Sequence, residues 1–160
     1  MKYLDYATVL INKVLLVLGG FAVLALMILA TGNVVLRIFH IPFRGTYEIV
    51  SFLGAIVISF ALGYTMKKRD HIVVDIVSDK FPEWLKRAID TLADIAIAVF
   101  FAIVGWQMYV WGMKIWNENE VSETLKIIYY PFVFACALGF IALSFNALVD
   151  FLKKIIGREE

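Results

Sequence analysis

The chain has 160 residues, of which 62% are hydrophobic and 18% charged, with a formal net charge of +1 at pH 7. Its mean hydropathy is +0.83. A composition this apolar leaves too little polar surface to cover a water-soluble globule, so it excludes a soluble domain. Basic residues do not gather on a face interleaved with aromatic residues, so nucleic acid is not an expected partner.

Four long apolar runs follow one another along the chain, each long enough at 1.5 Å per residue to cross most of a ~30 Å hydrocarbon core. They occupy residues 14–30, 49–66, 95–110 and 127–149. We therefore predict an all-α integral membrane protein with a single domain over residues 1–160. Its four transmembrane helices are expected at about residues 12–38, 47–67, 83–116 and 126–152.

The first run follows Lys2 and Lys13, as the apolar core of a signal peptide would. It is longer than such a core and has no clear cleavage site of small residues, which indicates an uncleaved transmembrane helix. Small residues recur at helical spacing along it and lead to Asn33 and Arg37 at its far end. This stripe consists of Gly19, Ala22, Leu26, Ala30, Asn33 and Arg37.

The second run begins beside Glu48 and has a similar stripe of small residues, Ser51, Ala55, Ser59 and Gly63. Small side chains let helices approach closely in lipid, so we predict that the first two helices pack along these stripes. Arg37 and Glu48 would then form a structural ion pair where the helices meet. The alternative is that Glu48 is the proton-coupling carboxylate of an autonomous small antiporter, although such a residue is expected nearer the membrane midplane.

Residues 71–81 follow the second helix and have apolar residues on one side and polar residues on the other, with His71 at the start and Asp75 on the polar side. This pattern predicts a short amphipathic helix in the membrane interface. Pro82 should begin the third transmembrane helix. That helix would extend for about 50 Å, so it must tilt, bend or protrude from the bilayer.

The third and fourth helices also have small faces, which include Asp94, Ala98, Ala102 and Gly105 on one helix and Ala135, Gly139, Ala142 and Asn146 on the other. Four helices do not obviously need this many packing faces, which points to a larger membrane partner.

Eleven of the fifteen Lys and Arg residues lie before the first apolar run, between the second and third runs, or after the fourth run. The positive-inside rule therefore places both termini in the cytoplasm. Cys136 lies alone in the fourth helix, and His40 and His71 fall on opposite membrane faces under this topology. We accordingly expect no catalytic residue, no metal site and no cofactor.

Several of these residues together resemble a known family. Asn33, Arg37, Pro42, Gly45, Thr46 and Glu48, followed by His71, Ile72, Val74 and Asp75, resemble the signature of the small membrane subunit of tripartite ATP-independent periplasmic (TRAP) transporters, the Q or DctQ-like component. The resemblance extends over nearly the whole chain and implies a multi-pass protein of the bacterial inner membrane. It implies structural or interface roles for Asn33, Arg37, Glu48, His71 and Asp75.

The resemblance also implies partners. In that family a periplasmic binding protein delivers an organic acid, and the large M subunit holds the substrate and sodium sites and moves by an elevator mechanism. The small subunit would enlarge the static scaffold and anchor it among the membrane lipids, with no substrate site of its own. A C4-dicarboxylate and a sialic acid both remain open as the substrate. An autonomous small transporter and a membrane enzyme remain the other classes of function.

Overall fold

The computed structural model describes residues 2–41, 43–68 and 83–155 of the chain. These residues form four helices, α1 (Lys2–Ile38), α2 (Thr46–Lys68), α4 (Glu83–Glu118) and α5 (Tyr130–Ile155). Each helix contains a stretch that is long and apolar enough to cross a membrane. The predicted all-α fold with four such helices is confirmed. The interfacial helix predicted at residues 71–81 lies outside the described residues.

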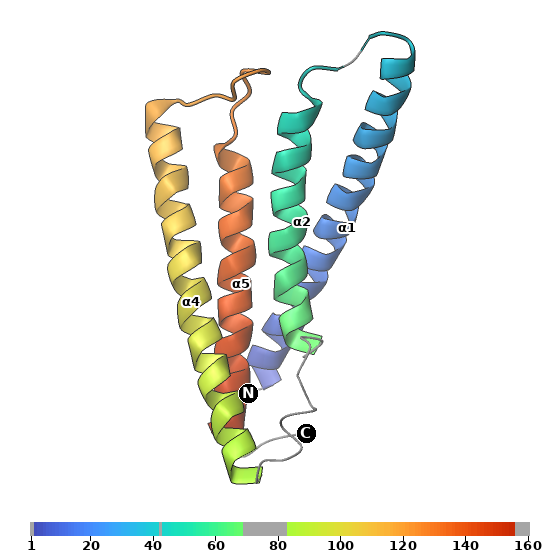
Figure 1. Ribbon diagram of the computed structural model, residues 1–160. Helices are drawn as coiled ribbons and strands as arrows, with labels where there is room; N and C mark the ends of the chain where they lie inside the picture. Colours follow the sequence, from blue (N-terminus) through green and yellow to red (C-terminus); the bar gives the residue numbers. More distant parts are fainter. Residues whose placement is uncertain (1, 42, 69–82, 156–160) are drawn as a thin grey trace.

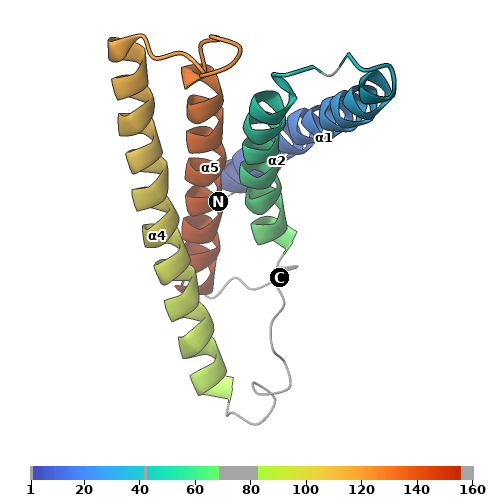
Figure 2. The same ribbon diagram turned by 45° about the horizontal axis from the view of Figure 1, so that its top comes forward.

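Successive helices run in opposite directions, so the α1–α2 loop and the α4–α5 loop lie at the same end of the bundle, here called the loop end (Figure 1). The first turns of α1 and the last turns of α5 lie at the other end. Helix α5 lies beside α4 and α2 and also contacts α1. The separation between α1 and α2 grows toward the loop end, and both views show this divergence (Figures 1 and 2).

Burial within the bundle follows from this arrangement. Half of the most apolar window of α5 is buried inside the protein, compared with 11% of the corresponding window of α1. Leu143 and Ala147 of α5 are almost completely buried, and Ala98 of α4 packs with them. Helix α5 is therefore the central packing element, while α1 leaves most of its apolar surface exposed.

Glycines bring α5 close to both of its neighbours. A Cβ atom on Gly105 of α4 would lie 2.8 Å from Cγ1 of Ile141, and one on Gly139 of α5 would lie 2.8 Å from the carbonyl oxygen of Ser59 in α2. The α4–α5 seam also contains a hydrogen bond, because the Ser144 hydroxyl donates to the carbonyl of Ala98 at 2.7 Å. Close backbone approach of this kind is the usual basis of helix association in lipid.

The predicted pairing of the α1 and α2 stripes is only partly correct. Gly19 of α1 does lie against Phe60 of α2, since a Cβ atom built on the glycine would be 3.5 Å from the Cβ of Phe60. However, Ser59 of the α2 stripe faces Gly139 of α5 instead of α1, and Ala30 of the α1 stripe is exposed. The physical reason is twofold: α1 and α5 both pack on α2, with α1 against Phe60 and α5 against the adjacent Ser59, and α1 diverges from α2 toward the loop end, where Ala30 lies.

Two helix starts also differ from those predicted. Helix α1 begins at Lys2, about three turns before the predicted start, and this added segment places the buried residues Thr8 and Asn12 within the bundle. Helix α5 begins at Tyr130 rather than at about residue 126. Lys126 has a φ of 54°, which a right-handed helix does not allow, and Val121 and Ile128 form an isolated antiparallel bridge.

Left-handed residues also end α1 and α4 at the loop end. His40 has a φ of 61°, and the Ile41 amide donates to the carbonyl of Leu36 at 3.0 Å. Asn119 has a φ of 52°, and the Glu120 amide donates to the carbonyl of Ile115 at 3.1 Å. Both ends have the hydrogen-bond pattern of a Schellman motif, which satisfies carbonyls that the helix itself leaves free.

Candidate functional site

The loop end is organised around the Glu48 carboxylate, which lies in the first turn of α2. Oε1 of Glu48 accepts a hydrogen bond from the backbone amide of Thr124 at 2.6 Å, and Oε2 accepts one from the amide of Leu125 at 3.1 Å. A carboxylate is also favoured at a helix N-terminus, where the helix dipole places partial positive charge. Glu48 thus connects the start of α2 to the α4–α5 loop.

The residues before Glu48 explain how the loop reaches it. Gly45 is buried beneath Leu125, and a Cβ atom at this position would overlap the leucine side chain. The next residue, Thr46, is also buried and donates its hydroxyl to the carbonyl of Phe43 at 2.8 Å. Glycine therefore permits the close approach of the two loops, and threonine fixes the turn that starts α2.

The α4–α5 loop has internal hydrogen bonds that hold its shape. Ser122 and Ile127 exchange backbone and side-chain hydrogen bonds, with the Ser122 amide donating to the Ile127 carbonyl at 2.9 Å and the Ile127 amide donating to the Ser122 hydroxyl at 3.2 Å. The Tyr129 hydroxyl donates to the Glu120 carboxylate at 2.6 Å. This bond raises the pKa of Tyr129 to about 12 and lowers the pKa of Glu120.

An open groove of about 360 Å³ separates this loop from the first turns of α2. The ring of Tyr129 stacks on Phe52 at a centroid distance of 5.8 Å and closes one side of the groove. Its lining residues are Tyr47, Glu48, Ser51, Phe52, Val121, Ser122, Glu123 and Tyr129. The Glu48 carboxylate in this groove is already bound by two amides, so it is poorly placed for the proton-coupling role considered as an alternative.

The ion pair predicted between Arg37 and Glu48 is not present. Arg37 is exposed at the end of α1 that leans away from α2, whereas the two amides of the α4–α5 loop occupy the Glu48 carboxylate. An ion pair does form at the loop end of α4, between Lys114 and Glu118 at 3.9 Å. Because the seven residues between Ile38 and Thr46 let the two helices diverge, closeness along the chain does not bring the charges of Arg37 and Glu48 together.

Asn33 has a local partner, since its side-chain oxygen accepts a hydrogen bond from the Phe43 amide at 3.1 Å. This bond holds the α1–α2 loop against the end of α1. His71 and Asp75, the other two residues selected from the sequence, lie outside the described residues. The interface roles of Asn33, Arg37, Glu48, His71 and Asp75 stay predictions.

A second polar site lies deep in the bundle, toward the end opposite the loops. The amide of Asn12 in α1 donates to the side-chain oxygen of Asn146 in α5 at 3.1 Å, and the amide of Asn146 donates back at 2.8 Å. Asn146 also donates to the carbonyl of Gly63 in α2 at 2.9 Å. Both side chains are at most 3% exposed. Sequence analysis selected Asn146 and Gly63 but missed Asn12, which precedes the apolar run.

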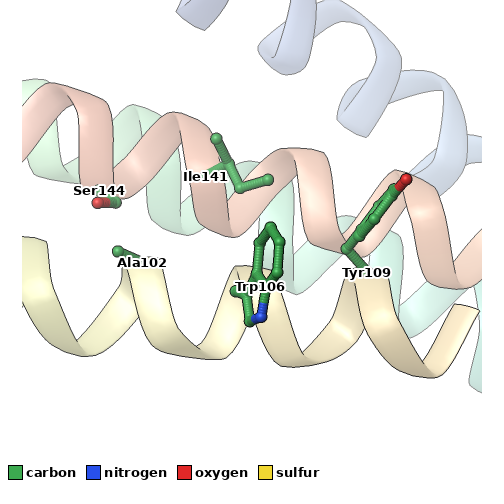
Figure 3. Close-up of a pocket in the computed structure, with 5 residues that line it drawn as sticks. All are labelled: Ala102, Trp106, Tyr109, Ile141 and Ser144. Atoms are coloured by element: carbon green, nitrogen blue, oxygen red, sulfur yellow. The ribbon is translucent and has the colours of Figure 1, made fainter.

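The α4–α5 seam has an apolar pocket of about 310 Å³ on its surface (Figure 3). It is lined by Ala102, Trp106 and Tyr109 of α4 and by Ile141 and Ser144 of α5. The Ser144 hydroxyl already donates to the Ala98 carbonyl, so this residue offers little hydrogen-bonding capacity to an organic acid. The pocket therefore has the chemistry of a contact for a hydrocarbon chain or an apolar side chain.

Within residues 2–41, 43–68 and 83–155, no group of three or more His, Cys, Asp or Glu side chains is placed to hold a metal ion. The polar contacts described above join helices and loops to one another. Cys136 is buried at 3% exposure in α5. The arrangement can fix the relative positions of α1, α2, α5 and the α4–α5 loop.

The fold defines a small helical membrane protein whose four helices each have the length and composition of a membrane span. Residues 26–157 match the family model described as "Tripartite ATP-independent periplasmic transporters, DctQ component". The chain therefore belongs to this family and is the small membrane component of a TRAP transporter. Comparison with curated proteins and with solved structures gave no match.

Proposed function

We propose that this chain is the non-catalytic scaffold subunit of its TRAP transporter, which anchors and stabilises the large M subunit in the membrane. The complex would import an organic acid, of the C4-dicarboxylate or sialic acid type, with sodium as the coupling ion. A periplasmic binding protein would deliver the substrate. Membership of the DctQ family supports these partners.

One observation carries the proposal. The buried amides of Asn12 and Asn146 bind each other and the carbonyl of Gly63, so they connect three helices. A transport site near the midplane would instead need polar groups directed toward a solute. The bundle uses these groups for its own rigidity, which is the property a static scaffold requires.

The exposed surface supports an anchoring role. Helices α1 and α4 have large apolar side chains exposed along much of their length, among them Phe21 and Ile28 on α1 and Val99 and Ile103 on α4. Lipid and partner helices can both cover such surfaces. We further propose that the loop end faces the periplasm and that both termini lie in the cytoplasm, on the basis of the basic-residue asymmetry.

Co-expression with the large subunit of the same transporter tests the scaffold proposal. An affinity tag on this chain should recover the large subunit at a stoichiometry of about one to one after detergent extraction. Without this chain the large subunit should aggregate or be degraded. A large subunit that is monodisperse alone and does not associate with this chain would refute the proposal.

A further inference from the structure

Helix α4 has an exposed face on the side opposite α5. Residues three and four positions apart share one face of a helix, and Phe100, Ile103, Gln107 and Val110 follow this spacing. All four are exposed, while Gly105 and Gly112 on the other side of α4 contact α5. We call the four exposed residues the Gln107 face.

Gln107 is the polar member of this face, and it lies within the apolar span of residues 91–118, in the half nearer the loop end. Lys114, a charged residue nearer the loop end, is seven residues farther along α4, or about 10 Å along the helix axis. The short side chain of Gln107 does not reach that level. Its side chain forms no hydrogen bond with any residue that the structure describes. By contrast, Asn12 and Asn146, the two buried amides of the bundle, satisfy each other.

An amide without a partner is costly in hydrocarbon, because lipid tails offer neither donors nor acceptors. The three apolar residues around Gln107 can pack against the apolar side chains of another helix. The amide then requires a hydrogen-bonding group on that helix. Helix α4 packs mainly on α5 within this chain, so the Gln107 face is not covered by α1 or α2.

We propose that the Gln107 face is the docking surface for one transmembrane helix of the large subunit. That helix would place a Ser, Thr, Asn or Gln side chain opposite Gln107 and apolar side chains against Ile103 and Val110. This inference rests on the proposed scaffold function, which supplies the large subunit as the neighbour. It assigns the contact to α4 rather than to the equally exposed surface of α1.

Photo-crosslinking in native membranes tests the contact directly. A benzophenone amino acid is incorporated at Gln107 in one variant and at Ile28 of α1 in another, with the tagged large subunit co-expressed. Ile28 is 74% exposed, so both positions are accessible. Illumination should give an adduct with the large subunit from position 107. Adducts from position 28 with none from position 107, or a dimer of this chain from position 107, would overturn the proposal.

A substitution pair tests the hydrogen bond. Gln107→Leu should weaken association with the large subunit by about three- to tenfold in nanodiscs, because a membrane hydrogen bond is lost while side-chain volume is nearly kept. Asn117→Leu is the matched control, since Asn117 is an exposed amide in the last turn of the same helix. It should leave association unchanged. Equal affinities for the wild type and Gln107→Leu would remove Gln107 from the interface.

The two proposals fail in different ways. If the wild-type chain binds the large subunit but the contacts map to α1, the scaffold function stands and the Gln107 assignment is wrong. If the wild-type chain forms no complex at all, the scaffold function itself fails. Size-exclusion profiles of each variant alone show whether a loss of binding arises from misfolding, and a misfolded Gln107→Leu is replaced by Gln107→Met in the same assay.

Discussion

Asn12 and Asn146 lie 134 positions apart in the sequence, and their side-chain amides exchange two hydrogen bonds at 3.1 and 2.8 Å in the bundle interior. Because Asn146 also donates to the Gly63 carbonyl, this pair joins α1, α5 and α2. The pair holds these three helices together at the end opposite the loops, where α1 remains in contact with α2 and α5.

Removing one amide of this pair should lower the free energy of unfolding by more than half of what the two amides contribute together. Asn146→Leu leaves the Asn12 amide buried without its partner, so we expect the free energy of unfolding to fall by about 1 to 2 kcal/mol. Unfolding in mixed micelles measures this change. The double variant Asn12→Leu and Asn146→Leu should lose less than the sum of the single losses. Strictly additive losses would show that the two amides do not interact.

Glu48 should control the order of the α4–α5 loop. Glu48→Gln removes the charge from the acceptor, so hydrogen exchange at the Thr124 and Leu125 amides should become roughly tenfold faster. Glu123→Gln is the control, because Glu123 is an exposed carboxylate of the same loop. Faster exchange in both variants would mean that the net negative charge at the loop end, and not the Glu48 hydrogen bonds, orders the loop.

Gly139 should be more sensitive to an added methyl group than Gly54. A Cβ at position 139 would lie 2.8 Å from the backbone of Ser59, whereas one at position 54 meets no atom within 4 Å. Gly139→Ala should therefore lower bundle stability by about 1 to 3 kcal/mol through overpacking. Gly54→Ala should leave it unchanged or slightly higher, as measured by thermal unfolding in detergent. The reverse order would contradict the α2–α5 packing described here.

Hydropathy alone was sufficient to predict the four helices, because a membrane span needs a long apolar run and little else. The small residues Gly105 and Gly139 indicated a packing face for a larger membrane partner, whereas in the structure Gly105 packs on Ile141 of α5 and Gly139 packs on Ser59 of α2. Which helix each small residue packs against could not be predicted from hydropathy. Ser59 packs against α5 because of the global arrangement of the bundle, which the α2 sequence does not encode locally.

The partner of Glu48 was missed for a related reason. Sequence spacing offered Arg37 as a nearby opposite charge, but the carboxylate binds backbone amides more than seventy residues away. Backbone donors leave no signal in residue identity, and their direction depends on the conformation of the α4–α5 loop. Asn12 was missed because it precedes the apolar run, although polarity beside a membrane span is itself a signal for buried pairing.

The orientation in the membrane can be tested by thiol labelling. Cys136 is buried in α5, so Cys136→Ala provides a background in which single cysteines replace Lys68, Glu120 or Lys154. In intact cells a membrane-impermeant reagent should modify the variant at position 120. It should leave those at positions 68 and 154 unmodified, because the basic-residue asymmetry predicts a cytoplasmic location for them. Modification of position 68 from outside would reverse the topology.

Sodium-driven uptake in proteoliposomes tests the scaffold function most directly. Vesicles that contain the large subunit and this chain, with the loaded binding protein outside, should accumulate a labelled C4-dicarboxylate or sialic acid under an inward sodium gradient. Vesicles with this chain alone should accumulate neither, and vesicles with the large subunit alone should show little or no uptake. Robust uptake by this chain alone, or full uptake without it, would contradict the assignment of a required but non-transporting scaffold subunit.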